Sequence, residues 1–172
     1  MLRIDLGALR HGSIDMAQTV SADDALFEGL EFQLSHEVIL SGRLMEAGSG
    51  RYYWHGKLET QAQSPCRRCL TPVSVEVSHP VEVLFTEDEM AEDAAAYALP
   101  PKAMELDPGD AVREELILAV PNYVVCTEDC RGICAGCGAD LNSGSCSCEP
   151  EPDHRWAALE SLKTAQHEEG RE

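Results

Sequence analysis

The sequence has few basic residues, few aromatic residues and no long apolar run. Only 13 of its 172 residues are Lys or Arg, against 31 Asp or Glu, so the formal net charge is −18. Because nucleic-acid affinity depends on Lys and Arg at phosphates, this balance argues against broad binding of RNA or DNA. Without about 18 consecutive apolar residues, no membrane-spanning helix is expected. The N-terminus lacks the pattern of a secretory signal, so we expect a cytoplasmic protein.

Common catalytic motifs are also missing. The sequence contains no His-Glu-x-x-His motif, no phosphate-binding Gly loop and no recognisable Ser/His/Asp set. Its six histidines are scattered, and each is expected to be a surface or structural residue rather than a ligand. We therefore expect no enzymatic activity, no catalytic residue and no small-molecule substrate.

Eight cysteines, by contrast, occur in four closely spaced pairs. In chain order the pairs are Cys66 and Cys69, Cys126 and Cys130, Cys134 and Cys137, and Cys146 and Cys148. Short spacings let two sulfurs converge on one ion, and Zn²⁺ takes four ligands at about 2.3 Å in a tetrahedron. Cytoplasmic thiols stay reduced, which favours metal over disulfides. The sequence thus predicts two structural Zn²⁺ sites of four cysteines each, with zinc preferred to an iron–sulfur cluster.

Two groupings of the four pairs are compatible with two sites. We favour one in which the third and fourth pairs share an ion across the Asn142-Ser-Gly-Ser turn, and the first and second pairs share the other. That grouping would join the segment that carries Cys126 and Cys130 to the loop that carries the first pair. The other grouping joins the second and third pairs and leaves the first with the fourth. A thioredoxin-like redox role for the first pair is less favoured, because Pro72 and a strand follow it instead of a helix.

Apolar and β-branched runs at residues 31–34, 38–46, 51–60 and 73–85 predict strands. A Gly-rich turn at 48–50 predicts a hairpin, and the first cysteine pair lies between the last two runs. Pro80 implies a bend or an edge position. The expected fold class is α+β: an antiparallel β-sheet or partly open barrel with a packed helix and a C-terminal, zinc-ribbon-like Cys-rich segment.

The remaining organisation follows from one strong helical pattern and two changes in composition. Residues 110–120 place Val112, Leu116 and Ala119 on one stripe, and Pro121 ends the helix. We expect a β-rich core domain over residues 1–125 and a Cys-rich zinc-binding segment over 126–150, which has few apolar residues and needs metal to fold. A C-terminal helix and frayed tail are expected over 151–172. The docking face expected for that helix consists of Trp156, Leu159 and Leu162.

Three arginines lie among the cysteines. Arg67 and Arg68 stand inside the first pair, and Arg131 follows Cys130. They could simply offset thiolate charge, because two Zn(Cys)₄ centres would take the net charge to about −22. They could also contact a phosphate or an acidic partner.

The order of these motifs resembles the YceD family of bacterial and plastid proteins, the large ribosomal RNA subunit accumulation proteins. The resemblance rests on the first cysteine pair between strands, the Asp110–Pro121 helix, the block from Cys126 to Asn142, and Cys146-Ser-Cys148. It implies a role in accumulation of 23S ribosomal RNA and association with large-subunit ribosomal proteins. It brings no catalytic residue.

The family role and the charge together suggest a mode of action. Ribosomal proteins are basic, and an acidic chain attracts them. We expect a non-enzymatic factor that supports 23S rRNA processing and large-subunit assembly by binding a basic ribosomal protein or a pre-ribosomal particle. One alternative is direct rRNA binding through Arg67, Arg68 and Arg131, and another is a thiol redox protein.

Overall fold

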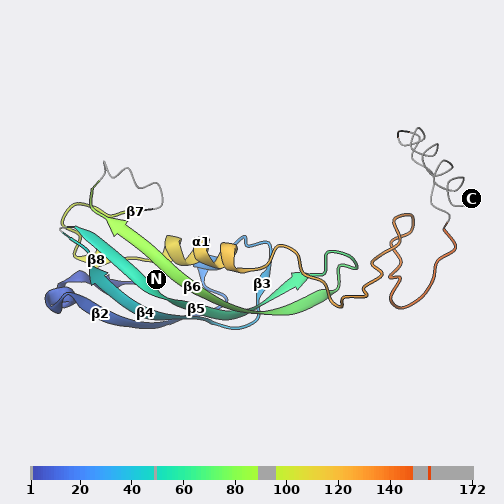
Figure 1. Ribbon diagram of the computed structural model, residues 1–172, viewed down its shortest axis with the longest axis horizontal. Coiled ribbons are helices and arrows are strands. Elements are labelled where there is room, and N and C mark those ends of the chain that lie inside the picture. The colour runs from blue at the N-terminus through green and yellow to red at the C-terminus, as the bar shows by residue number, and fades with distance from the viewer. Residues whose placement is uncertain (1, 49, 89–95, 149–154, 156–172) are drawn as a thin grey trace, which may run out of the picture. The chain divides into compact units, whose positions relative to one another are not determined.

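The computed structural model describes residues 2–48, 50–88, 96–148 and 155 (Figure 1). The chain forms two compact units. The first comprises Met1–Arg67 and Thr71–Cys126, and the second comprises Arg68–Leu70 and Thr127–Glu172. The helix expected over 151–172, with its proposed docking face, lies outside the described residues apart from Arg155. Within the described part of the chain, no helix is long and apolar enough to cross a membrane.

One open sheet forms most of the first unit (Figure 1). Its main path is β2 (Ser13–Val20), β4 (Val38–Glu46), β5 (Arg51–Pro65), β6 (Pro72–Thr86) and β7 (Tyr97–Ala98). A short β3 (Gln33–Leu34) also pairs with β5, while β1 (Ile4–Asp5) and β8 (Glu105–Leu106) form a separate two-stranded sheet. The expected sheet is observed, but not a barrel: among the described residues β2 pairs only with β4, so the sheet does not close. Pairing is antiparallel except at β7, which runs parallel to β6.

The long β5–β6 hairpin carries the first cysteine pair at its tip. Its register runs from Arg51 opposite Thr86 to Pro65 opposite Pro72, so the hairpin extends further than the predicted run of residues 51–60. Side chains alternate between the core and solvent along β4, β5 and β6, as the apolar pattern predicted. Residues on the core side form one buried cluster with the N-terminal segment and the helix.

Pro80 lies in the middle of β6 and does not interrupt it. The N–H of Glu87 donates to the carbonyl of Gly50 at 2.8 Å, so these opposed residues form a hydrogen-bonded pair. Because such pairs alternate along an antiparallel ladder, odd-numbered residues of β6 bond to β5 and even-numbered residues point to the other edge. Pro80 is even-numbered, so its missing N–H costs no ladder bond. This agrees with the predicted edge position.

Helix α1 (Gly109–Ala119) packs on β6 and lies over one face of the sheet (Figure 1). Val112 and Leu116 are fully buried, as the stripe predicted, whereas Ala119 is only half-buried. The helix ends before Pro121, with Val120 in an extended conformation. Arg113 donates to the carbonyls of Leu26 and Glu28, fixing the helix to the 3₁₀ turn η2 (Ala25–Phe27). Another 3₁₀ turn, η1 (Leu6–His11), precedes β2.

A pair of opposed glycines makes room for the largest core side chain. Gly42 of β4 lies opposite Gly56 of β5, and the buried indole of Trp54 packs against both. A Cβ on Gly56 would lie 2.1 Å from the carbonyl oxygen of Ser41. These two positions therefore exclude any side chain.

Candidate metal centres

The eight cysteines gather into two groups of four. Within each group all four sulfurs lie within 4.8 Å of one another. One group consists of the first and second pairs, Cys66, Cys69, Cys126 and Cys130; the other consists of the third and fourth pairs, Cys134, Cys137, Cys146 and Cys148. Bonds of about 2.3 Å in a tetrahedron place sulfurs about 3.8 Å apart, so each group fits one tetrahedral ion. The structure brings together the grouping that the sequence favoured.

The first group is built on the tip of the β5–β6 hairpin. The N–H of Cys66 donates to the carbonyl of Thr71 at 2.9 Å and closes the tip, and Leu70 takes the left-handed conformation with φ of 63°. The segment after α1 runs beside this tip, because the N–H of Arg67 donates to the carbonyl of Val124 at 2.8 Å. The N–H of Cys126 then donates to the sulfur of Cys66 at 3.4 Å. Such N–H···S bonds stabilise a thiolate.

Two of the three arginines hold these loops. The Nε of Arg67 donates to the carbonyl of Asn122 at 2.6 Å. The guanidinium of Arg68 donates to the carbonyls of Glu128 at 3.1 Å and Cys130 at 3.0 Å. Both side chains thus bond to backbone carbonyls beside the cysteines. These bonds favour a structural role for Arg67 and Arg68 over contact with a phosphate or a partner. Arg131 is exposed.

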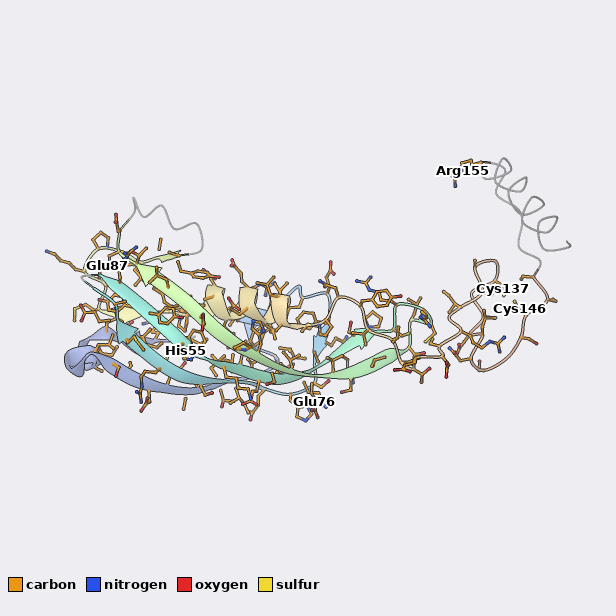
Figure 2. The ribbon with its side chains drawn as sticks, in the orientation of Figure 1. His55, Glu76, Glu87, Cys137, Cys146 and Arg155 are labelled. Atoms are coloured by element: carbon orange, nitrogen blue, oxygen red, sulfur yellow. The ribbon has the colours of Figure 1, made fainter. Side chains whose placement is uncertain are left out.

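The second group is built on a tight turn in the second unit. Cys134 bonds to Ala139 through its N–H and to Gly138 through its carbonyl, both at 2.8 Å, with Gly138 at a φ of 73°. This turn brings Cys137 toward Cys146 (Figure 2). An isolated bridge joins Ile133 and Asp140, but the described residues form no paired strands there, so a zinc-ribbon architecture stays a prediction.

The thiols of the second group differ in pKa, because they share hydrogen bonds and negative charge. Hydrogen bonds from the Cys137 backbone, the Cys146 thiol and the Gly136 N–H lower the pKa of Cys134 to about 6. Hydrogen bonding to Cys137 and Cys134, with their negative charge, raises the pKa of Cys148 to about 12. Four adjacent sulfurs cannot all ionise in the absence of a cation. A dication would compensate their charge, so this donor set suits a metal ion.

Asn142 joins the turn at Asp140 to the segment that carries Cys130 and Arg131. The sequence did not predict this role. Its Oδ1 accepts from the N–H of Arg131 at 2.7 Å, and its Nδ2 donates to Asp140 at 2.7 Å and to the sulfur of Cys130 at 3.5 Å. Its own N–H donates to Asp140 at 2.9 Å. The Asp-x-Asn pattern at a turn was the available signal, since these residues bond to nearby backbone.

Comparisons with known proteins identify a family. A sequence profile described as "Large ribosomal RNA subunit accumulation protein YceD" matches residues 54–163, which include all eight cysteines and α1. A chloroplastic YCED homolog 1 of Arabidopsis thaliana, named a large ribosomal RNA subunit accumulation protein, is 33% identical over 65 residues, covering 37% of this chain and 20% of that protein. The Zea mays homolog 1 is 26% identical over 132 residues, covering 59% and 45%.

An uncharacterized protein of Mycobacterium tuberculosis is 28% identical over 109 residues, covering 60% of this chain and 52% of its own length. The chain thus spans about half the length of these curated relatives or less. No solved structure matches the chain. Because the profile covers more than half of the sequence, the chain belongs to the YceD family.

Proposed function

We propose that this protein is a non-enzymatic factor that supports accumulation of the large ribosomal subunit's 23S RNA. The observation that carries the proposal is the family match over residues 54–163, which covers most of the hairpin, α1 and both cysteine groups. The name of the family and of its plant relatives refers to this accumulation. Processing, stability and subunit assembly are the steps through which such a factor would act.

In this proposal the cysteine groups are structural zinc sites. Each has four sulfur ligands, and a catalytic zinc usually keeps an open position for water instead. A redox role is disfavoured by the same count, because a bound ion would occupy every thiol of the group. Zinc would supply the folding free energy that residues 127–148, with few buried apolar side chains, do not obtain from burial.

The proposed mode of action is binding of a basic ribosomal protein in the cytoplasm. The net charge of −18 attracts basic partners and repels naked RNA. Direct rRNA binding through Arg67 and Arg68 receives less support, because both guanidinium groups already bond to backbone carbonyls. Arg131, like Arg67 and Arg68, is exposed.

Depletion of the protein in its own organism tests the proposed function. The ratio of mature 23S to 16S rRNA is expected to fall and to recover with the wild-type gene. An unchanged ratio would overturn the proposal. In a second assay, purified large-subunit ribosomal proteins and naked 23S rRNA are titrated separately against the purified protein. Salt-sensitive binding of a basic protein is expected, and binding of the RNA alone, lost on changing Arg131→Ala, would favour the rRNA-binding alternative.

A further inference from the structure

Among the strands that the structure describes, one long edge of the sheet is paired over only two residues. Within the described residues, β7 pairs with β6 only at Phe85 and Thr86. Even-numbered residues of β6 point their backbone groups toward this edge, as shown for Pro80. Ser74, Ser78 and Glu82 are exposed, and in the described part of the chain their N–H and carbonyl groups have no strand partner there, whereas Pro80 presents a carbonyl alone. An edge of this kind can accept a further strand.

A groove of about 400 Å³ lies where β7 leaves this edge. Its floor is the end of β6, and its walls are the start of β7 and the outer face of α1. The lining residues are Glu82, Val83, Ala96, Tyr97, Glu114, Glu115 and Leu118. Leu118 is 75% exposed, so an apolar contact is available beside the open backbone.

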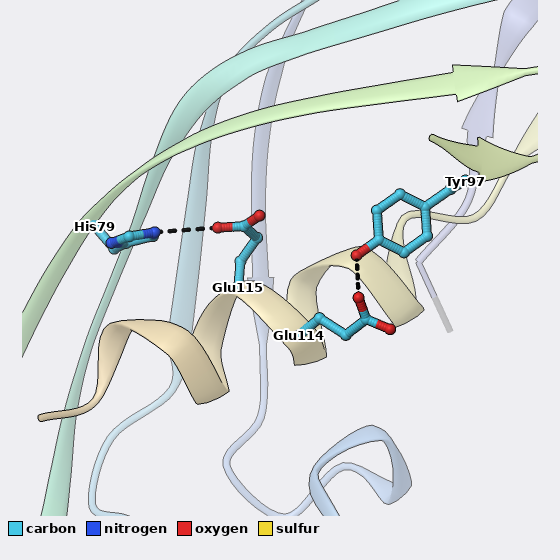
Figure 3. Close-up of polar contacts among 4 residues, drawn as sticks. All are labelled: His79, Tyr97, Glu114 and Glu115. Carbon is cyan, nitrogen blue, oxygen red and sulfur yellow. Dashed lines mark hydrogen bonds and ion pairs between the residues drawn. The ribbon is translucent and has the colours of Figure 1, made fainter. Parts of the chain in front are cut away.

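The charge of the lining indicates what kind of chain fits. Three of the lining residues are carboxylates and none is Lys or Arg. Tyr97 donates to Glu114 at 2.5 Å, and His79 contacts Glu115 at 3.1 Å (Figure 3). The pKa of Tyr97 is raised by burial, by this hydrogen bond and by nearby carboxylates, which agrees with a negative potential in the groove. Each of these carboxylates has a second oxygen that can accept a hydrogen bond from a cationic group.

A second copy of this chain is a poor occupant of the edge. Glu76 lies on the sheet face away from α1 (Figure 2), and Glu82 shares that face. Pairing of β6 with another β6 would bring these carboxylates close to each other, which is destabilising. A basic strand would place Lys or Arg near them instead.

We propose that the open edge of β6 beside α1 binds an extended, Lys- or Arg-rich segment of the basic partner as an additional strand. This inference rests on the proposed function for the identity of the partner. Backbone bonds to Ser78 and Glu82 hold the segment, with Pro80 supplying an acceptor only. Side chains on one face of the segment reach Glu115 and Leu118, and those on the other face reach Glu82.

Amide hydrogen exchange on the full-length protein tests the pairing directly. The probes are the ribosomal protein found in the titrations above and a synthetic eight-residue peptide of alternating Lys and Val. The N–H groups of Ser78 and Glu82 should exchange rapidly in the free protein and become protected in either complex. Those of Val77 and Val81, which face β5, should be protected in both states and serve as internal controls. A peptide with Glu in place of Lys should give no protection.

Substitutions separate the backbone and charge contributions. Ser78→Pro removes one edge N–H and should weaken binding about fivefold, whereas Ala17→Pro, at an outward-pointing position of β2, should have no effect. Pro80→Ser adds a donor and should strengthen binding by a similar factor. Glu82→Gln with Glu114→Gln should weaken binding about tenfold and flatten its salt dependence. Glu37→Gln with Glu128→Gln changes the net charge equally and is the matched control.

The outcomes test the binding edge of β6 separately from the proposed function. If the wild-type protein binds a ribosomal protein and all β6 variants bind it equally well, the inference is overturned and the proposed function stands. If no basic ribosomal protein binds, the proposed mode of action fails. The Lys-Val peptide then tests the edge by itself, and a peptide that leaves the N–H groups of Ser78 and Glu82 unprotected overturns the inference. Should Ser78→Pro fail to fold, Pro80→Ser with unchanged affinity gives the same negative result.

Discussion

Removal of metal is expected to unfold residues 127–148 and to leave the sheet of the first unit folded. Within that segment only Cys130 and Gly132 are buried, and Ile133 is 36% exposed. Partial burial of Ile133 and Leu141 contributes about 3 kcal/mol at most. A structural zinc ion contributes about 10–16 kcal/mol of apparent binding free energy. Metal is therefore the dominant stabilising term in this segment.

The first unit has a different source of stability. Trp54, Phe85, Leu40, Leu44 and Leu58 are among its fully buried side chains. Burial of each contributes about 1.5–3 kcal/mol, so the sheet retains a core without any ion. Loss of the first cysteine group should loosen the hairpin tip near Cys66 without melting the strands.

Amide exchange before and after treatment with a strong chelator measures both effects. The reporters in the second unit are the N–H groups of Cys134, Gly138 and Leu141, which bond within the turn. They should lose protection in the metal-free protein and regain it when zinc is restored, while the N–H of Leu58 stays protected throughout. Persistent protection of the three reporters without metal would refute the reasoning, because it would show that burial and hydrogen bonds alone hold the segment.

Three further predictions follow from the packing, the turn and the titrating groups. Gly56→Ala should lower the free energy of unfolding by about 3 kcal/mol in urea denaturation, because its Cβ would meet the carbonyl oxygen of Ser41 at 2.1 Å, whereas Gly144→Ala, with nothing within 4 Å, should change nothing measurable. Asn142→Leu should speed zinc release to a colorimetric chelator, since it removes the bonds to Arg131 and Cys130, and equal release rates would contradict the role given to Asn142. Because the pKa of Tyr97 is raised above its ordinary value of 10, its contribution to stability is complete below pH 10 and is lost as pH rises through the higher, folded-state value. The difference between the absorbance titrations of the wild type and Tyr97→Phe isolates this phenol, which should ionise above pH 10, and an ordinary titration for Tyr97 would contradict this.

The strongest sequence signals were those with a fixed period or spacing. Alternation in residues 38–46 and 73–85 predicted β4 and β6, and the stripe of Val112 and Leu116 predicted α1. Cysteine spacing predicted the two groups of sulfurs, since each short pair can face only a few partners. Local chemistry was sufficient in these cases.

The features that sequence reasoning missed depend on tertiary contacts. β2 mixes Ser13, Asp15 and Thr19 with apolar residues and becomes a strand by pairing with β4. The parallel β7 is two residues long, too short for any periodic signal. Arg67 and Arg68 gave no hint of their carbonyl partners, because those partners are more than 50 residues away in the chain. Such contacts emerge only after the elements have packed.

Metal content of the natively purified protein tests the central claim most directly. Two zinc ions per chain are predicted, one for each group of four sulfurs. Replacement of Cys134 and Cys137 by Ser should leave one zinc ion bound, and replacement of Cys66 and Cys69 should have the same effect at the other group. A protein that contains no zinc and retains eight freely titrating thiols would contradict the claim. A wild-type protein with a single zinc ion that is lost on replacement of either cysteine pair would also contradict it.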